Sequence, residues 1–357
     1  MTRLRTLRRL GAILLMPLAV LAAAEPPPAG PEQQQRFNAA LEEKLAVRDA
    51  DGRLPRAQPL RDGWIVLSSE LRHASLAQVH GAAAAGSSRA QNKKLADPVP
   101  TITGLAAQLK ARGIELIVLP VPTKVSTHPA MLLDGLPSPA PRFDPAGRAF
   151  LAELDRQGVT AVDMLPALAA GDPTYGRGHC QQDAHWTAWG TVAAAQRVAA
   201  LVKDRPWLAE ARAGRPATQA EWIQETFSNG DLRRGVLREE APGETLWLRK
   251  IGVDGKAVAS DPTAPVLLVG DSHTQVFQDG GAFLATRAGL HSQLVHELGV
   301  PVWRMSQSGG GAKAGVSLVL ALKKDADALA KVKLVIWCFA IRETSETSEG
   351  WPQVTLP

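Results

Sequence analysis

Apolar and polar residues alternate along the chain in a way that predicts strands and helices in turn. Short apolar runs, which are typical of buried strands, occur at residues 114–119, 159–162, 265–269 and 332–339. Stretches with a helical pattern lie at residues 101–112, 148–157 and 187–202. Strands that alternate with helices usually form a parallel sheet covered on both faces. We therefore expect an α/β fold with three layers, α/β/α, around a central, mostly parallel sheet.

Residues 205–262 break this rhythm and carry Trp207, Trp222 and Trp247 among charged residues, glycines and prolines. We interpret this region as an insertion in the main domain. Its tryptophans could stack on sugar rings in the wall of a groove. Packing is the more frequent role of a tryptophan, and we favour it here.

The two ends of the chain differ from the middle. Residues 1–24 combine four arginines with an uncharged run and predict a secretory signal peptide, cleaved after Ala24, with an uncleaved signal anchor as the alternative. Residues 25–59 are expected to form a flexible, proline-rich leader and a helix, and residues 346–357 a C-terminal tail. The main domain is therefore expected at residues 60–345.

The charge balance changes once the leader is set aside. The chain has 40 basic and 35 acidic residues, but residues 1–24 hold four of the basic and none of the acidic ones, so 36 and 35 remain. A nearly neutral protein lacks the excess of positive charge that nucleic-acid binding requires. We expect no nucleic-acid partner.

Two short polar segments carry the candidate chemistry. Asp183, His185 and Trp186 lie in one, and Ser272 follows the apolar run 265–269 in the other. In an extended segment, residues two apart project to the same side, so Asp183 can orient the imidazole of His185. A serine directly after a buried strand is a frequent place for a nucleophile. The two segments together predict a triad of Ser272, His185 and Asp183.

The residues around the serine also have structural explanations. Ser272 could cap a helix that starts near Thr274, Asp271 could stabilise the turn, and His273 could be only a part of it. The acid-base segment elsewhere in the chain favours the catalytic interpretation of the serine.

Three further stretches accompany the two polar segments, at residues 62–72, 119–124 and 335–342. The five stretches, in this order, resemble the alginate O-acetyltransferase family (the AlgJ/AlgX type) of the SGNH hydrolase-like superfamily. The motif order of that family is permuted relative to ordinary SGNH esterases. The resemblance covers roughly residues 60 to 345, and it departs from the family at Cys338, where a glutamate often follows the tryptophan.

The resemblance implies an SGNH-like fold and an enzyme that O-acetylates a bacterial exopolysaccharide, alginate-like or cellulose-like, in the periplasm. Ser272 would carry the acetyl group, His185 would be the base, and Asp183 would orient it. The donor would be a membrane acyltransferase, within a possible polysaccharide secretion complex, and no cofactor is implied. Two alternatives stay open: a carbohydrate acetylesterase that passes the acyl group to water, and a non-catalytic scaffold of a secretion complex.

The oxyanion formed in acyl transfer needs hydrogen-bond donors. We expect the Ser272 amide and an amide of the glycine-rich loop, from Gly310 or Gly311, to supply them. Candidate contacts to the substrate are Arg342, Trp186 and His273. For Trp186, we favour packing beneath the loop over contact with the acyl group. An ion pair with Glu343 or Glu70 is an alternative role for the arginine.

Cys180 and Cys338 are the only cysteines, which suits an exported protein with at most one disulfide. A bridge between them and two separate thiols are both compatible with the sequence, because bridging depends on their distance in space. His179 lies near Asp183 and His185, but zinc-like ligand spacing is lacking beyond Cys180. We therefore expect no metal.

Overall fold

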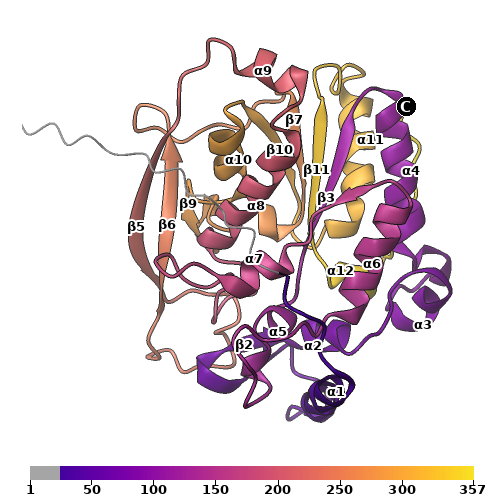
Figure 1. Ribbon diagram of the computed structural model, residues 1–357, viewed down its shortest axis with the longest axis vertical. Helices are drawn as coiled ribbons and strands as arrows, with labels where there is room; N and C mark the ends of the chain where they lie inside the picture. The colour runs from indigo at the N-terminus through magenta and orange to yellow at the C-terminus, as the bar shows by residue number, and fades with distance from the viewer. Residues whose placement is uncertain (1–24) are drawn as a thin grey trace, which may run out of the picture.

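A five-stranded parallel sheet forms the centre of the structure, a computed structural model that describes residues 25–357 (Figure 1). Its strands lie in the order β10 (Val302–Ser306), β7 (Val266–Gly270), β11 (Leu334–Ala340), β3 (Glu115–Val121) and β4 (Thr160–Ala161). The three inner strands, β7, β11 and β3, are buried almost throughout. They contain the three longest apolar runs, which predicted them correctly.

Helices cover both faces of this sheet. One face carries α7 (Leu165–Ala170), α8 (Ala188–Val202) and α10 (Leu290–Leu298), and the other carries α4 (Pro98–Ala111), α6 (Pro145–Arg156) and α11 (Ala314–Lys324). Successive residues of a buried strand point to opposite sides, so in β7 Leu268 packs toward the first group and Leu267 toward the second. The expected three-layer α/β/α fold is confirmed.

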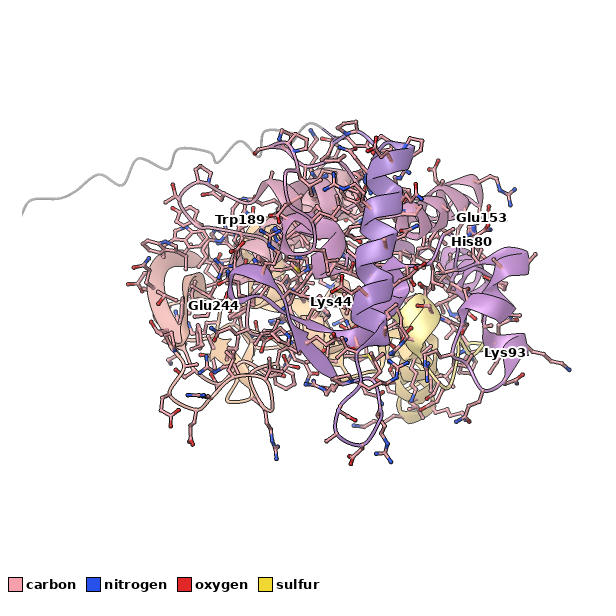
Figure 2. The ribbon with its side chains drawn as sticks, turned by 90° about the horizontal axis from the view of Figure 1, so that it is seen from below. Lys44, His80, Lys93, Glu153, Trp189 and Glu244 are labelled. Atoms are coloured by element: carbon pink, nitrogen blue, oxygen red, sulfur yellow. The ribbon has the colours of Figure 1, made fainter. Side chains whose placement is uncertain are left out.

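The N-terminal part of the described chain packs on the body of the protein. It contains α1 (Pro31–Ala46), β1 (Ala57–Pro59), β2 (Ile65–Leu67) and α2 (Ser68–Ala74). Helix α1, which carries Lys44 in Figure 2, buries Phe37 and Leu41 in a cluster with Trp64. The Ala29 amide donates to the carbonyl of Arg142 at 2.9 Å, so the segment that we expected to be a flexible leader is docked.

Residues 205–262 form α9 (Pro206–Arg212) and a hairpin of β5 (Gln219–Phe227) and β6 (Glu244–Gly252), which is a separate two-stranded sheet. Tyr175 stacks on Trp222 with ring centroids 3.6 Å apart and lies edge-on to Trp247 at 5.8 Å. Trp207 packs against the same core cluster. These contacts are the packing role that we favoured for the three tryptophans.

Residues 346–357 also pack against the domain. Trp351 is buried, its amide donates to the carbonyl of Leu95 at 2.7 Å, and its carbonyl accepts from Thr101 Oγ1 at 2.8 Å. The remaining short elements are α3 (Ala84–Ser87), α5 (Lys124–Thr127), β8 (Asp279–Gly280), β9 (Phe283–Thr286) and α12 (Glu343–Glu346).

Within residues 25–357, no helix combines the length and the apolar character needed to cross a bilayer. The predicted signal peptide or anchor lies outside the described residues.

Candidate active site

The predicted functional segments meet at the carboxyl edge of the parallel sheet, where ligands bind in folds of this kind. Strand β7 ends at Gly270, just before Ser272, and β11 ends at Ala340, just before Arg342. Helices α5 and α12, which directly follow β3 and β11, both contact α2 and lie with it below the sheet in Figure 1. The fold therefore brings segments from distant parts of the chain to one edge.

The turn that carries Ser272 is fixed by the aspartate before it. Asp271 Oδ1 accepts the His273 amide at 2.9 Å, and Oδ2 accepts the Ala340 amide at 2.7 Å. A Cβ atom at Gly270 would lie 2.0 Å from the Cys338 carbonyl oxygen, so only glycine fits where the turn leaves the strand. Asp271 rather than Ser272 caps the short 3-10 turn, and the half-buried Ser272 side chain is left available for chemistry.

Asp183 and His185 form a buried pair in the loop before α8. Asp183 Oδ1 accepts from His185 Nδ1 at 2.6 Å and from the His185 amide at 3.1 Å. Burial is the largest single influence and disfavours the charged form of each side chain, but their mutual attraction and hydrogen bond, together with smaller influences of neighbouring groups, outweigh it. Together they lower the pKa of Asp183 to about 2 and raise the pKa of His185. This arrangement fixes Nδ1 as the donor and stabilises an imidazolium, as a general base requires.

Two acidic residues of the 205–262 region hold this acid-base loop in place. Glu244 accepts from the amides of Gln181 at 2.8 Å and Gln182 at 3.0 Å. Asp231 accepts the Ala184 amide at 2.7 Å, and its own amide donates to Asp183 Oδ2 at 3.0 Å. Figure 2 labels Glu244. Neither residue was predicted from the sequence, because an isolated acid in an irregular region gives no sign that it binds backbone amides of a distant loop.

Lys124 supports the same loop from the sheet side. Its side chain is fully buried, and Nζ donates to the carbonyls of Ile65 at 2.7 Å and Gln181 at 3.5 Å. Burial lowers the pKa of Lys124, and the nearby Glu70 carboxylate opposes that change. The lysine of the 119–124 stretch thus joins β2 to the acid-base loop.

The acid-base loop and the serine turn touch each other directly. Trp186 Nε1 donates to the carbonyl of His273 at 3.2 Å, and the rings of His185 and His273 meet edge to face with centroids 4.9 Å apart. Trp186 and His273 are 0% and 2% exposed. Neither ring offers a surface to a substrate in this structure, so burial favours the packing and turn roles of these residues over the candidate contact to a substrate.

The candidate oxyanion donors lie beside the serine turn. The Gly310 amide already donates to the carbonyl of Gln307 at 2.8 Å. A Cβ atom at Gly311 would lie 3.4 Å from Asp271 Oδ2, and the Gly311 carbonyl accepts from Trp337 Nε1 at 2.7 Å. Of the two glycines, Gly311 has the position next to the serine turn.

Arg342 is half-buried at the end of β11. Within the described residues, its guanidinium forms no ion pair shorter than 4 Å, so the alternative pairing with Glu343 or Glu70 is not seen. Its charge contributes to lowering the pKa of Asp271, after the larger influences of burial, which acts in the opposite direction, and of His273.

Cys180 and Cys338 are both free and buried, so the structure has two separate thiols rather than a bridge. Asp183, His185 and Asp231 offer possible metal ligands within 4.8 Å of one another. The oxygens of both carboxylates already accept N–H groups, as described above, and a metal would have to displace these donors. We therefore treat the three residues as a hydrogen-bonded group.

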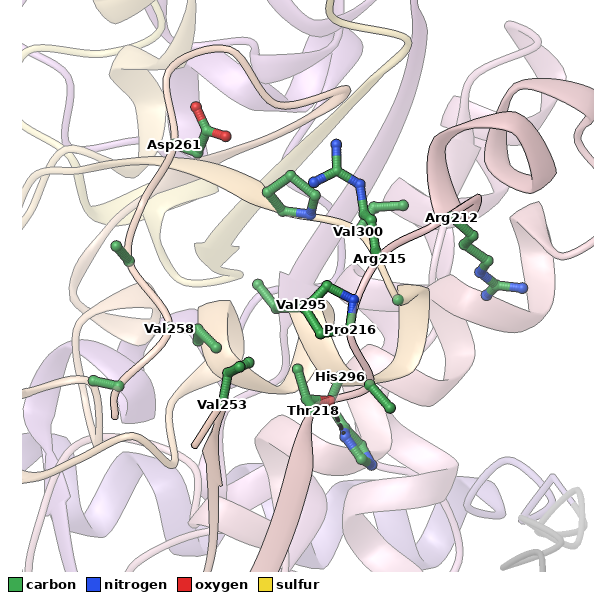
Figure 3. Close-up of a pocket in the computed structure, with 15 residues that line it drawn as sticks. Arg212, Arg215, Pro216, Thr218, Val253, Val258, Asp261, Val295, His296 and Val300 are labelled. Carbon is green, nitrogen blue, oxygen red and sulfur yellow. Dashed lines mark hydrogen bonds between the residues drawn. The ribbon is translucent and has the colours of Figure 1, made fainter. Parts of the chain in front are cut away.

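A cavity of 660 Å³ lies away from this site, near the amino end of β10 (Figure 3). Apolar side chains such as Val258, Val295 and Val300 line it, with Arg215 and Asp261 among its few charged residues. None of the predicted triad residues contacts this cavity. The predicted triad therefore lies at the opposite end of the sheet from this space.

Comparisons with known proteins agree with this fold. Residues 61–341 match the family model described as an SGNH hydrolase-like domain, acetyltransferase AlgX. Two proteins named "Probable alginate O-acetylase AlgJ", from Pseudomonas syringae pv. tomato and Pseudomonas fluorescens, are 30% and 28% identical over 191 and 183 residues. The matches cover 50% and 48% of this chain and 47% and 45% of those proteins, so the chain spans less than half the length of these curated relatives.

Two solved structures have a similar fold. The O-acetyltransferase domain of Pseudomonas putida AlgJ has a TM-score of 0.59 at 22% identity, over 81% of this chain and 92% of that one. Pseudomonas aeruginosa AlgX has a TM-score of 0.54 at 18% identity, over 80% and 61%. At these identities, the likeness to solved structures establishes the fold alone. The family match over most of the chain establishes membership, and the chain belongs to the SGNH hydrolase-like family of the acetyltransferase AlgX.

Proposed function

We propose that this protein is an O-acetyltransferase that moves acetyl groups onto hydroxyls of a bacterial exopolysaccharide, alginate-like or cellulose-like. The proposal rests above all on the buried Asp183–His185 pair, which packs against the turn that carries Ser272. Membership of the family and the names of the AlgJ relatives support acetyl transfer, with alginate as one candidate acceptor.

The reaction proceeds in two acyl transfers. Ser272 Oγ attacks the carbonyl carbon of the donor acetyl group while His185 takes the hydroxyl proton, and the tetrahedral intermediate collapses to acetyl-serine as His185 returns the proton to the leaving group. A sugar hydroxyl then attacks the acetyl-serine, His185 takes its proton, and Ser272 is released with that proton. Asp183 holds the Nδ1–H tautomer of His185 and stabilises the cation in both steps.

The developing oxyanion needs backbone donors near Ser272. The Ser272 amide is the first candidate and the Gly311 amide the second, because the Gly310 amide is bonded to Gln307. Arg342 is the candidate contact to the acceptor, since it is half-buried at this edge and free of ion pairs within the described residues. Trp186 and His273 are assigned to support of the site.

The cellular location and the partners that we propose are those implied by the resemblance to the family. The protein acts in the periplasm, after export by residues 1–24 as a signal peptide or anchor. It receives acetyl groups from a membrane acyltransferase, in a possible polysaccharide secretion complex. Residues 60–345 are the proposed catalytic domain, with the 205–262 region as its insertion.

The test follows cleavage of a chromogenic acetyl ester by the purified protein, with and without oligosaccharides, and detects acetylated sugar by mass spectrometry. We expect sugar acetylation that Ser272→Ala lowers by at least about 10³-fold while the thermal melt is unchanged. Serine-dependent cleavage with no sugar product would indicate an esterase. Activity that survives Ser272→Ala would overturn the proposal, and polymer acetylation that persists in a Ser272→Ala strain would favour the scaffold.

A further inference from the structure

The turn that carries the proposed nucleophile contains a second pair of the same kind as Asp183 and His185. Asp271 Oδ1 accepts the His273 amide at 2.9 Å and lies 3.1 Å from His273 Nδ1. In the first pair, the corresponding distances are 3.1 and 2.6 Å. In each pair, Oδ1 of an aspartate thus contacts both the backbone amide and Nδ1 of the histidine two residues later.

The two pairs are joined through their rings. The imidazoles of His185 and His273 lie edge to face, with centroids 4.9 Å apart and planes at 67°. The indole of Trp186 lies edge-on to His273 at 5.6 Å and donates to its carbonyl, which ties the neighbour of His185 to the same turn. His185 therefore has a carboxylate at Nδ1 and a second, anchored imidazole against its ring.

The environments of the two histidines give them different tasks. His185 is 7% exposed, whereas His273 is 2% exposed and out of reach of a polymer. Burial lowers the pKa of His273, and the Asp271 carboxylate does not fully compensate; the pKa of His185 is raised. A neutral His273 donates from Nδ1 to Asp271, so His185 is the ring that carries the proton during the reaction.

We propose that His273, held by Asp271, is a positioning residue for His185: its ring fixes the orientation of the base beside Ser272, and the Asp271 charge behind it supports the imidazolium. The inference rests on the proposed role of His185 as the base. It gives a function to the histidine after the serine, which the sequence alone left either as a part of the turn or as a candidate contact to the substrate.

The charged groups around the two rings agree with this assignment. Asp183, Asp231 and Asp271 all favour the cationic form of His185. On the His273 side, Arg342 opposes protonation, as does a charge on His185. Lys124 helps to lower the pKa of Asp183, and the pKa of the nearby His179 is itself lowered, chiefly by burial and also by His128, Lys124 and His273. Only one of the two rings is therefore expected to be positively charged at a time.

The experiment measures labelling of Ser272 by phenylmethylsulfonyl fluoride, which needs a working base but no sugar acceptor. His273→Asn keeps an N–H that can reach Asp271 and removes the ring, whereas His273→Phe keeps a ring and removes the donor. We expect His273→Asn to slow labelling about tenfold at an unchanged thermal melt, and His273→Phe to recover part of the rate. Asp271→Asn should move the half-maximal pH of labelling downward, because it removes one of three carboxylates that favour the imidazolium.

The outcomes separate this inference from the proposed function. Labelling rates within twofold of the native rate in both His273 variants would overturn the inference. A lower melting temperature with an unchanged rate would also overturn it, because His273 would then be only structural. Native labelling without sugar acetylation would overturn the proposed acceptor and leave the positioning test intact. A native protein that labels at no pH would overturn both.

Discussion

The serine turn and the acid-base loop are neighbours at one edge of the sheet, but they are held in different ways. Asp271 binds the Ala340 amide of β11, and Thr274 Oγ1 bonds to Ser306 Oγ at the end of β10, so the turn is tied to the main sheet. The acid-base loop has its amides bound by Glu244 and Asp231, which come from outside that sheet.

The proposed nucleophile and the proposed base are therefore positioned by different parts of the chain. The position of Ser272 follows from the same core contacts that stabilise the domain. The position of His185 depends, besides Lys124 on the sheet side, on Asp231 and Glu244, which lie 47 and 63 positions after the Ala184 and Gln181 amides that they bind. We infer that changes in the 205–262 region can misplace the base while the sheet and the serine turn stay intact.

The largest effect on kcat is expected from a substitution in the acid-base loop. Asp183→Asn keeps the size of the side chain but removes the charge that fixes the Nδ1–H tautomer of His185. We expect kcat for acetyl-ester cleavage to fall by about 10³- to 10⁴-fold, with circular dichroism unchanged. Asp261→Asn, at an aspartate near the distant cavity, is the matched control and should stay within twofold. A loss smaller than tenfold in Asp183→Asn would show that Asp183 does not orient the base.

An intermediate effect is expected where the acid-base loop is clamped. Glu244→Gln leaves one oxygen for the two amides of Gln181 and Gln182 and weakens the pairing with Arg177. We expect kcat to fall by about 10- to 100-fold, because a base displaced by about 1 Å loses that much. Steady-state cleavage of the acetyl ester measures kcat. Urea unfolding should show that the free energy of unfolding of the variant is about 1–3 kcal/mol lower than that of the native protein.

Glu225→Gln is the control for this clamp. Glu225 lies on the neighbouring strand β5, is partly exposed, and within residues 25–357 forms an ion pair only with Lys250, at 3.4 Å. Both kcat and stability should therefore stay near the native values. Equal effects of the two substitutions would mean that the hairpin as a whole, rather than Glu244, places the base.

The same comparison explains which features of the fold and the site could be predicted from the sequence and which could not. The inner strands were predictable because strands buried on both faces are apolar throughout. The residues of the proposed triad could be singled out because they lie in short, ordered segments. Strand β10 was missed because it is a half-buried edge strand that carries Arg304. Asp231 and Glu244 were missed because their partners are backbone amides, which any residue supplies, so only the folded chain reveals the contacts.

A titratable group on the serine side gives a test that concerns stability more than turnover. Glu343 follows β11, and a Cβ atom at Gly311 would lie 2.9 Å from its Cγ. Burial raises the pKa of Glu343 from 4.5 to about 7; Asp271 adds to the effect and Arg342 opposes it. The folded protein therefore binds a proton at Glu343 more tightly than the unfolded chain does. The resulting stability is complete below pH 4.5 and is lost as the pH rises to about 7.

The smallest effect on turnover is expected when this group is removed. Glu343→Gln keeps the shape of the side chain but cannot ionise, so it should cancel the part of the pH dependence that Glu343 supplies. Between pH 5 and pH 8, we expect the free energy of unfolding of the native protein to fall by about 1–3 kcal/mol more than that of the variant. Urea unfolding at the two pH values measures this difference, and Glu349→Gln, at an exposed residue paired with Lys313, should follow the native curve. Identical declines in the free energy of unfolding of the native protein and of Glu343→Gln would mean that Glu343 titrates alike in the folded and unfolded states. The contacts between the serine turn and the sheet would then stabilise the protein without a contribution from Glu343 that depends on pH.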